Sequence, residues 1–359
     1  MEALQVHDFK IKSIVKDYEV FFIDNSAETL LKEIKLGDVV LIDKKIKKLH
    51  KEIHKIIPKN NLVIEVEAVE NQKSYEGLEN IIGKLIDGGF KKNNRLIAIG
   101  GGITQDITAF TASIMYRGVD WLFFPSTLLA QGDSCIGSKT SINFGKYKNQ
   151  LGGFHPPIKI FIDLKFLNTL SNQDFKSGLG EMCHYFIVAG KDEFFNYKEN
   201  YNKAYTEKLG LKKIISDSLK IKKKYIEIDE FDRNERQIFN YGHSFGHAIE
   251  SLTNYSIPHG IAVSFGMDIA NFISIKMGIL NDNVRYQIRE LLQQIWQEYS
   301  IKDLDVDEFC KALSKDKKNV GTELRLILCK DYGKVYKMAV KNDQIFKSWL
   351  LEYIKDEAH

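Results

Sequence analysis

The residues best suited to chemistry form one short stretch, GHSFGHAIE, at positions 242–250. On a helix, His243 and His247 would lie one turn apart and project from the same face. A glycine inside a helix costs about 1 kcal/mol relative to alanine, so the glycines beside these imidazoles need a reason. A metal site, a phosphate site and ordinary packing would each account for the pattern.

Other side chains that bind metals occur in the same half of the chain. His259 opens a predicted helix sixteen residues after His243, and Glu181 lies on an earlier glycine-flanked helix with His184 one turn further on. One glutamate and two histidines with an open fourth position are a common catalytic zinc set. The glutamate of HExxH is missing, which disfavours a metalloprotease. A hydrogen-bonded interior residue is the alternative for any single histidine, but three beside glycines favour a metal.

A second candidate site follows a predicted strand, where RLIAIGGGITQDITAF runs through the glycines at 100–102 into a helix. Glycines allow backbone amides to approach a ligand, and a helix N-terminus favours phosphate. Asp106, one turn into the helix, could hydrogen-bond a sugar hydroxyl or cap the helix. Asp43 and Glu70, further upstream, could hold the ribose of a nucleotide. A tight turn and solvated carboxylates are the alternative.

A third cluster of polar residues lies within 115–157, interleaved with glycines. Its charged and amide side chains are Arg117, Asp133, Lys139, Lys148 and Asn149. Lysines neutralise phosphate, and Asp and Asn pair with hydroxyls, so the set suits a phosphorylated polyhydroxyl ligand. A hairpin with exposed charges is the alternative, and the neighbouring apolar TLLA and GGF segments make binding the better interpretation.

Short β-rich runs alternate with helical stretches through the first half of the chain. The predicted strands are 20–24, 39–43, 62–69, 95–100, 121–125 and 158–163. A helix is predicted over 74–89, and the alternation indicates a doubly wound, mostly parallel, Rossmann-like α/β sheet.

From about residue 172 the periodicity is helical nearly throughout, apart from a hairpin predicted from TELRLILCK and KVYKMAV. We therefore expect an α/β domain at 1–170 and a mainly α-helical domain at 171–359. The lysine-rich stretch 44–59 reads as a solvated amphipathic helix.

Composition excludes several classes of protein. The 359 residues carry a formal net charge of +3, which is too even to make nucleic acid the main partner. The longest apolar runs are too short to span a bilayer, and the N-terminus lacks an apolar signal core. The four cysteines show no CxxC spacing, as expected of free thiols in the cytoplasm.

Long motifs of the chain resemble one family, 3-dehydroquinate synthase, within the sugar phosphate cyclases. GGGITQDITAF is similar to the family's NAD-binding turn. The span YRG…PSTLLAQGDSCIGSKTSIN…KNQLGGFHPP resembles its longest substrate-binding signature. SGLGEM, FNYGHSFGHAIE and HGIAVSFGM are similar to its metal-binding segments, and the resemblance runs from about residue 35 to about 330.

The resemblance implies a role for each matching residue. Glu181, His243 and His259 would bind Zn²⁺, or Co²⁺. The NAD site would be lined by Asp43, Glu70, Lys73, Gly101, Gly102, Asp106, Thr127, Lys139 and Lys148. Residues that hold the substrate or act on it would be Arg117, Asp133, Lys139, Asn149, His184, Lys222, Arg236, Asn240 and His247, with Lys317 or Lys318 as a further contact. Arg117 would reach the partner's phosphate pocket in a homodimer.

The implied reaction cyclises a small-molecule sugar phosphate, 3-deoxy-arabino-heptulosonate 7-phosphate, to 3-dehydroquinate in the shikimate pathway. NAD takes a hydride from a secondary alcohol that zinc polarises, phosphate leaves by β-elimination, and the hydride returns. Ring opening and an intramolecular aldol step then close the carbocycle, and NAD emerges unchanged.

The chain departs from the family at His184, where the family carries a lysine, and at Gly132, where a small apolar residue is usual. Arg236 still indicates an acid substrate, because guanidinium pairs bidentately with carboxylate. Asn240 follows the dehydroquinate pattern, whereas relatives that make deoxy-inosose carry an acid there. A cyclase acting on another heptulose phosphate, such as sedoheptulose 7-phosphate, is the alternative.

Two other classes are less favoured. A metal-dependent NAD alcohol dehydrogenase of the glycerol dehydrogenase type needs no phosphate pocket, so Arg117, Lys139, Asn149 and Lys222 argue against it. A non-catalytic homologue would keep NAD and zinc binding alone. Only His184 favours that class, and the complete glutamate and histidine set opposes it.

Overall fold

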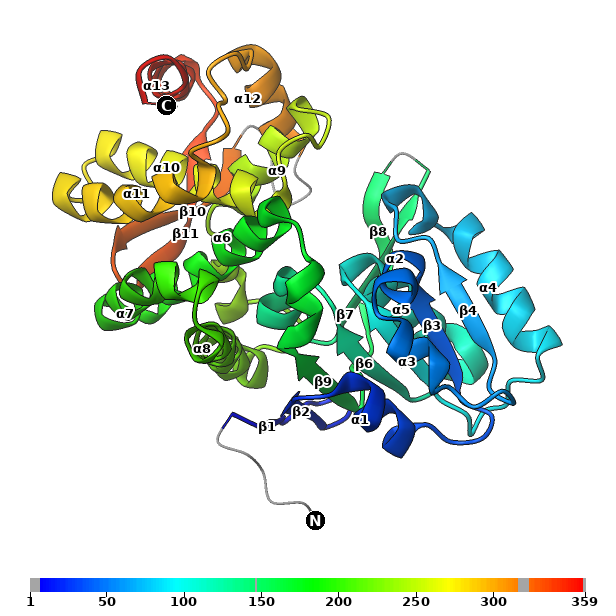
Figure 1. Ribbon diagram of the computed structural model, residues 1–359. Coiled ribbons are helices and arrows are strands. Elements are labelled where there is room, and N and C mark those ends of the chain that lie inside the picture. The colour runs from blue at the N-terminus through cyan, green and yellow to red at the C-terminus, as the bar shows by residue number, and fades with distance from the viewer. Residues whose placement is uncertain (1–6, 146, 316–322, 358–359) are drawn as a thin grey trace. The chain divides into compact units, whose positions relative to one another are not determined.

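A computed structural model describes residues 7–145, 147–315 and 323–357 of the chain (Figure 1). The chain divides into two compact units. Unit 1 comprises Met1–Ser171 with Lys222–Phe231, and unit 2 comprises Asn172–Ile221 with Asp232–His359. The short stretch Lys222–Phe231 therefore joins the first unit although it follows helices of the second.

Unit 1 is built on a seven-stranded sheet in the order β1-β2-β9-β6-β5-β3-β4. The strands are β1 (Phe9–Ile11), β2 (Tyr18–Ile23), β3 (Val39–Asp43), β4 (Val63–Val66), β5 (Leu96–Gly100), β6 (Trp121–Pro125) and β9 (Lys159–Asp163). Only β1 pairs antiparallel in this sheet. The predicted parallel α/β sheet is confirmed.

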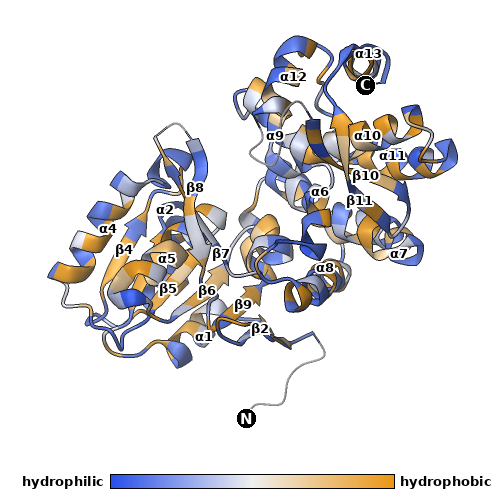
Figure 2. Ribbon diagram, turned by 180° about the vertical axis from the view of Figure 1, so that it is seen from behind, coloured by the Kyte–Doolittle hydropathy of each residue, from blue (hydrophilic) through white to orange (hydrophobic). Residues whose placement is uncertain are grey.

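The inner strands are apolar on both faces, as a sheet covered by helices requires. Val40, Ile42, Ile97 and Ile99 join Leu122 and Phe124 in one buried cluster. Leu30, Ile46 and Ile53 reach this cluster from three helices, α1 (Ser26–Glu33), α2 (Lys44–Leu49) and α3 (Lys51–Lys55). Figure 2 shows the hydrophobic colouring of the inner strands, which contrasts with the mixed colouring of α4 (Tyr75–Asp87).

The predicted helix over 74–89 is α4, with Ser74 as its N-cap and Leu78, Ile81 and Leu85 buried. The single helix predicted over 44–59 is wrong, because it breaks between α2 and α3 at His50 (φ −116°, ψ 63°). The His50 ring is buried against Phe166, and its Nε2 lies 3.0 Å from Thr169 Oγ1. Tertiary packing of one imidazole therefore overrides the helical pattern.

Unit 1 also contains α5 (Gly102–Ile114), a π-type turn at Ala130–Ser134 and a hairpin of β7 (Lys139–Phe144) and β8 (Tyr147–Phe154). Short 3₁₀ turns lie at Glu70–Gln72, Met115–Arg117 and Leu164–Thr169. The polar cluster at 115–157 is thus partly a hairpin.

Unit 2 is mainly helical. Its helices are α6 (Asn172–Ala189), α7 (Lys191–Tyr201), α8 (Lys208–Ile228, which passes into unit 1 at Lys222), α9 (His243–Leu252), α10 (His259–Lys276), α11 (Asp282–Trp296), α12 (Val306–Ser314) and α13 (Gln344–Glu352). Shorter turns lie at Asn202–Tyr205, Glu235–Asn240 and Tyr353–Glu357. The predicted late hairpin is β10 (Glu323–Asp331) with β11 (Lys334–Lys341). In the described ranges, no helix is both long and apolar enough to cross a membrane.

Candidate active site: a nucleotide edge and a metal centre

Several predicted site residues of unit 1 lie at one edge of the sheet. Ile42 pairs with Ile99, and Gly100 pairs with Pro125, so β3, β5 and β6 end together. Asp43 ends β3, the glycines follow β5, and Thr127 follows β6. The chain passes from β3 out to β4 and then returns to the opposite side of β3 as β5. Ligands of open α/β sheets bind at such a switch point, outside the carboxyl ends of the strands.

The glycine turn leaves space in front of α5. Gly101 is the N-cap and provides no side-chain cap hydrogen bond. A Cβ on Gly101 would approach Thr127 Cγ2 to 2.9 Å, whereas a Cβ on Gly102 would meet no described atom within 4 Å. The backbone amides that begin α5 therefore face open space, and the positive end of a helix attracts phosphate there.

Lys73, Asp106 and Asn149 form one polar network beside this turn. Lys73 Nζ lies 2.6 Å from Asp106 Oδ2 and donates to Asn149 Oδ1 at 2.7 Å. Asp106 also accepts from the Ser141 amide at 3.1 Å, so it does not cap α5. Burial raises the pKa of Asp106, and the adjacent Lys73 ammonium opposes that rise. These hydrogen bonds hold the Lys73 ammonium and the Asp106 carboxylate in fixed orientations.

Sequence reasoning missed Asn143, which connects two of the predicted residues. Its side-chain amide donates to Glu70 Oε1 at 2.8 Å, and its Oδ1 accepts from the Asn149 amide at 2.9 Å. Asn149 has φ +53°, a left-handed conformation that asparagine tolerates. Lys148 Nζ lies 3.7 Å from Glu70 Oε1. The sequence offered one hint of this role: Asn143 lies two residues after Ser141, which also joins the network.

Asp133 and Lys222 are brought together by the stretch that joins unit 1. Lys222 Nζ lies 2.6 Å from Asp133 Oδ1 and donates to the Asp133 carbonyl at 2.8 Å. Lys222 is buried, whereas Lys139, at the start of β7, is exposed. Two residues predicted to contact the substrate are therefore paired with each other.

Arg117 does not join these groups within its own chain. It lies beyond the C-terminal end of α5, whose 13 residues span roughly 20 Å. The side chain is exposed, and the backbone has φ +67° after Tyr116 at φ +50°. Two successive left-handed residues hold Arg117 on the surface of the unit, because Tyr116 is anchored by a 2.7 Å hydrogen bond from its hydroxyl to the Phe90 carbonyl.

In unit 2, glycines let three helices approach closely. A Cβ on Gly260 would come within 1.8 Å of the Ser177 carbonyl oxygen, so α10 contacts α6 backbone to backbone. Gly242 has φ +82°, and a Cβ there would come within 2.7 Å of the Val263 carbonyl oxygen. A Cβ on Gly180 would likewise come too close to the Gly260 carbonyl oxygen. These glycines directly adjoin the three predicted ligands Glu181, His243 and His259.

The predicted ligands converge on one point. Glu181 Oε1 lies 3.2 Å from His243 Nε2, and Glu181 Oε2 lies 3.4 Å from His259 Nε2. One ligand atom from each residue falls within 4.8 Å of the other two. Burial alone would raise the pKa of Glu181, but His243 and His259 hold that pKa well below its usual range. The carboxylate is therefore ionised in the folded protein.

This donor set fits a divalent cation. Glu181 Oε2 is buried and accepts no hydrogen bond from any described residue. His243 Nδ1 lies 3.3 Å from the Tyr241 carbonyl oxygen, an acceptor that can take the ring proton when Nε2, 3.2 Å from Glu181 Oε1, binds a cation. A lone pair facing a buried carboxylate needs positive charge between them, from a proton or from a metal. Glutamate with two imidazole nitrogens is a common zinc set.

The other predicted residues of unit 2 lie around this triad. His184 is buried, with Nδ1 3.9 Å from Glu181 Oε1 and its ring 5.3 Å from that of His243. His247 is exposed, and its ring centroid lies 5.6 Å from that of His259. Arg236 and Asn240 precede α9 in the turn Glu235–Asn240, where Arg236 is buried. Lys317 and Lys318 lie outside the described residues.

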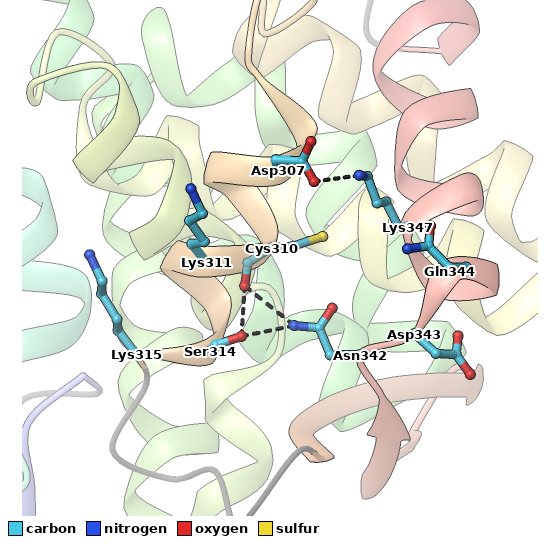
Figure 3. A pocket seen from close by; sticks show the side chains of 9 residues that line it. All are labelled: Asp307, Cys310, Lys311, Ser314, Lys315, Asn342, Asp343, Gln344 and Lys347. Carbon is cyan, nitrogen blue, oxygen red and sulfur yellow. Dashed lines mark hydrogen bonds and ion pairs between the residues drawn. The ribbon is translucent and has the colours of Figure 1, made fainter.

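A surface pocket of unit 2 lies elsewhere, between α12 and α13 (Figure 3). Asp307 and Lys347 form an ion pair across it, and the Asn342 amide donates to Ser314 Oγ at 2.8 Å. Its lining contains none of the predicted site residues. The pocket therefore belongs to neither the nucleotide edge nor the metal centre.

Comparison with known sequences identifies relatives along most of the chain. The family model described as 3-dehydroquinate synthase N-terminal matches residues 63–177, and the one described as 3-dehydroquinate synthase C-terminal matches residues 178–319. The 3-dehydroquinate synthase of a Thermoanaerobacter species is 36% identical over 79% of this chain and 80% of its own. That of Campylobacter concisus is 32% identical over 97% of this chain and 99% of its own.

Solved structures share the fold. A 2-deoxy-scyllo-inosose synthase complexed with carbaglucose-6-phosphate, NAD⁺ and Co²⁺ superimposes with a TM-score of 0.86 at 23% identity, covering 97% of this chain and 99% of its own. A 2-epi-5-epi-valiolone synthase from Streptomyces hygroscopicus, with NAD⁺ and Zn²⁺ bound, gives a TM-score of 0.79 at 21% identity, covering 93% and 96%. An iron-containing alcohol dehydrogenase from Corynebacterium glutamicum gives 0.62 at 12%, covering 99% and 97%.

The two family models adjoin at residues 177 and 178 and together cover the glycine turn and the metal centre, whereas Asp43 precedes the matched range. The Campylobacter concisus relative extends the match, at 32% identity, over 97% of the chain. The chain thus belongs to the 3-dehydroquinate synthase family of phosphate-eliminating cyclases.

Proposed function

We propose that this enzyme converts 3-deoxy-arabino-heptulosonate 7-phosphate to 3-dehydroquinate with release of phosphate, using NAD and zinc. The observation that carries the proposal is the convergence of ionised Glu181 with His243 and His259 in a chain of this family. The NAD⁺ and metal ions bound by the structural neighbours support the same pair of cofactors.

Glu181, His243 and His259 would hold the zinc ion, with Co²⁺ as a substitute. When bound, NAD would accept and return a hydride, and zinc would polarise the oxygen of the alcohol that is oxidised. The chain's own contribution is to bring the Glu181 carboxylate and both Nε2 atoms to one point. Exposed His247, one helical turn beyond His243, would contact the substrate, and buried His184 would support Glu181 from 3.9 Å away.

The edge of the sheet in unit 1 would hold NAD. The amides at Gly101 and Gly102 would receive the pyrophosphate, and Thr127 packs beside them. Asp43 and Glu70 lie at the carboxyl ends of β3 and β4, where ribose hydroxyls are held in such folds. Lys73, Asp106, Lys139 and Lys148 would complete this site, in which Asp106 is held by Lys73 and by the Ser141 amide.

The predicted substrate contacts are polar groups. Asp133, Lys139, Asn149 and Lys222 offer acceptors for hydroxyls and cations for phosphate. Arg236 would pair with the substrate carboxylate, and Asn240 would contact a hydroxyl. Holding one compact ligand in reactive geometry supplies much of the rate acceleration of such a reaction.

We further propose that the enzyme is a cytoplasmic homodimer that serves the shikimate pathway. Arg117 is exposed and roughly 20 Å along α5 from the glycine turn, so within one chain it cannot contact a phosphate there. A second copy would give this arginine a ligand to bind. The functional division into an NAD-binding domain at 1–170 and a metal- and substrate-binding domain at 171–359 is part of the same proposal.

The substrate proposal is tested by comparing 3-deoxy-arabino-heptulosonate 7-phosphate with sedoheptulose 7-phosphate, which lacks the carboxylate. We expect phosphate release from the acid only. Arg236→Gln should lower kcat/KM for the acid about 10- to 100-fold, because a charge-assisted hydrogen bond contributes about 1.5–3 kcal/mol. Exposed Arg233→Gln, three residues earlier in the chain, is the matched control and should change little.

Other outcomes would point to other enzymes. Release of phosphate from the neutral heptulose alone would make this a specialised cyclase, and His184→Lys would then be the first reversion to make. Net formation of NADH from a simple polyol would favour a dehydrogenase. Binding of NAD and zinc without turnover of either phosphate would favour a non-catalytic homologue.

A further inference from the structure

The exposed side of α9 carries a third functional residue beyond its two histidines. Glu250 lies seven residues after His243 and three after His247, so all three project from one helical face. Glu250 Oε2 lies 3.0 Å from His259 Nδ1. The Glu250 side chain is only 14% exposed, which keeps water from competing for this contact.

This contact determines which nitrogen of His259 can bind a metal. A neutral imidazole carries one N–H and one lone pair, and an ionised carboxylate can only accept a hydrogen bond. When Nε2, which lies 3.4 Å from Glu181 Oε2, binds a metal, the His259 proton must be on Nδ1, where Glu250 can accept it. His243 has the same arrangement, with the Tyr241 carbonyl in place of the carboxylate.

His247, Glu250 and His259 form a competing set whose ligand atoms also fall within 4.8 Å of one another. His259 belongs to both sets, so the two sets compete for it. The outer member His247 is exposed, whereas the Glu181 set holds a buried carboxylate. The Glu181 set is therefore the stronger site, and a metal bound there requires Glu250 as an acceptor of the His259 proton.

We propose that Glu250 is a positioning residue of the metal centre, which fixes the Nδ1–H tautomer and the ring orientation of His259 without itself binding the metal. The inference rests on the proposed metal centre. Carboxylates that orient a metal-binding histidine in this way change metal affinity about 10- to 100-fold when they are removed.

The test is competitive titration of the metal-free full chain with Zn²⁺ against a chromophoric chelator. Glu250→Ala should weaken zinc binding about 10- to 100-fold. Glu250→Gln keeps an acceptor oxygen and should lose less. In the metal-free protein, ¹⁵N chemical shifts of His259 should report Nδ1–H in the wild type and a mixture of tautomers in Glu250→Ala. Thermal unfolding of the metal-free variants shows whether each one folds.

His247→Ala and Glu181→Ala separate the two sets of ligands. We expect His247→Ala to keep wild-type zinc affinity within about threefold, well under the 10-fold loss that removal of an orienting group causes, and Glu181→Ala to lose it. If His247→Ala and Glu181→Ala lost zinc affinity to the same extent, Glu250 would be a ligand of the outer set, and the inference would be overturned. Unchanged zinc affinity and an unchanged tautomer in Glu250→Ala would also overturn it. A wild-type chain that binds no zinc would refute the metal centre itself, which distinguishes the two failures.

Discussion

At the residue scale, the types and spacing of a few side chains pointed to groups that the fold brings together. His243, His259 and Glu181 converge as predicted, although they are 16 and 62 residues apart in the sequence. Asn143 and Glu250 were not found in advance, because their role depends on which neighbours they contact. Glu250 could have been suspected, since it continues the face of the helix that carries both histidines.

The open space in front of Gly102 leads to a prediction for NAD. Gly102→Ala adds a methyl group that meets no described protein atom within 4 Å, so the fold should tolerate it. The methyl group would enter the space assigned to the pyrophosphate, and we expect NAD affinity to fall at least about 10-fold, or about 1.4 kcal/mol. Isothermal titration with NAD measures this change.

Gly83→Ala is the matched control for this variant. Gly83 lies inside α4, and a Cβ there would also meet no described atom within 4 Å. The added methyl group should raise helix stability by about 0.5–1 kcal/mol and leave NAD affinity unchanged. Equal NAD affinity in wild type and Gly102→Ala would place the pyrophosphate away from this turn.

At the scale of elements, periodicity predicted the parallel strands, α4 and the late hairpin. It failed where tertiary contacts decide the backbone, as at His50, whose ring is held between Phe166 and Thr169. It also could not reveal how closely α6, α9 and α10 approach. That closeness depends on glycines whose missing Cβ atoms leave room for a neighbouring backbone, and a sequence shows the glycines without showing their neighbours.

The contact between α6 and α10 yields a prediction for stability. The methyl carbon of Gly260→Ala would lie only 1.8 Å from the Ser177 carbonyl oxygen, and neither backbone can move easily to relieve the clash. We expect a loss of about 1–3 kcal/mol in the free energy of unfolding, as for other overpacked cores. Zinc affinity should fall as well, because His259 would move away from Glu181. Urea unfolding of the metal-free protein measures the first effect, and a stability equal to wild type would contradict the packing described.

At the scale of the whole molecule, the chain folds as two units that the sequence separates only in part. The sequence indicated the change from a sheet to helices near residue 170, and unit 2 begins at Asn172. The return of Lys222–Phe231 to unit 1 was not visible, because the pattern of α8 is helical on both sides of Lys222. That return brings Lys222 to Asp133.

The central claim is that the chain uses NAD as a recycled cofactor while it eliminates phosphate. The most direct measurement follows phosphate and NADH together in a reaction of the zinc-loaded enzyme with 3-deoxy-arabino-heptulosonate 7-phosphate and less NAD than substrate. The account predicts many phosphates released for each NAD present, with 3-dehydroquinate as product and NAD still oxidised at the end. Phosphate that never exceeds the NAD supplied, or NADH that accumulates with product, would contradict it.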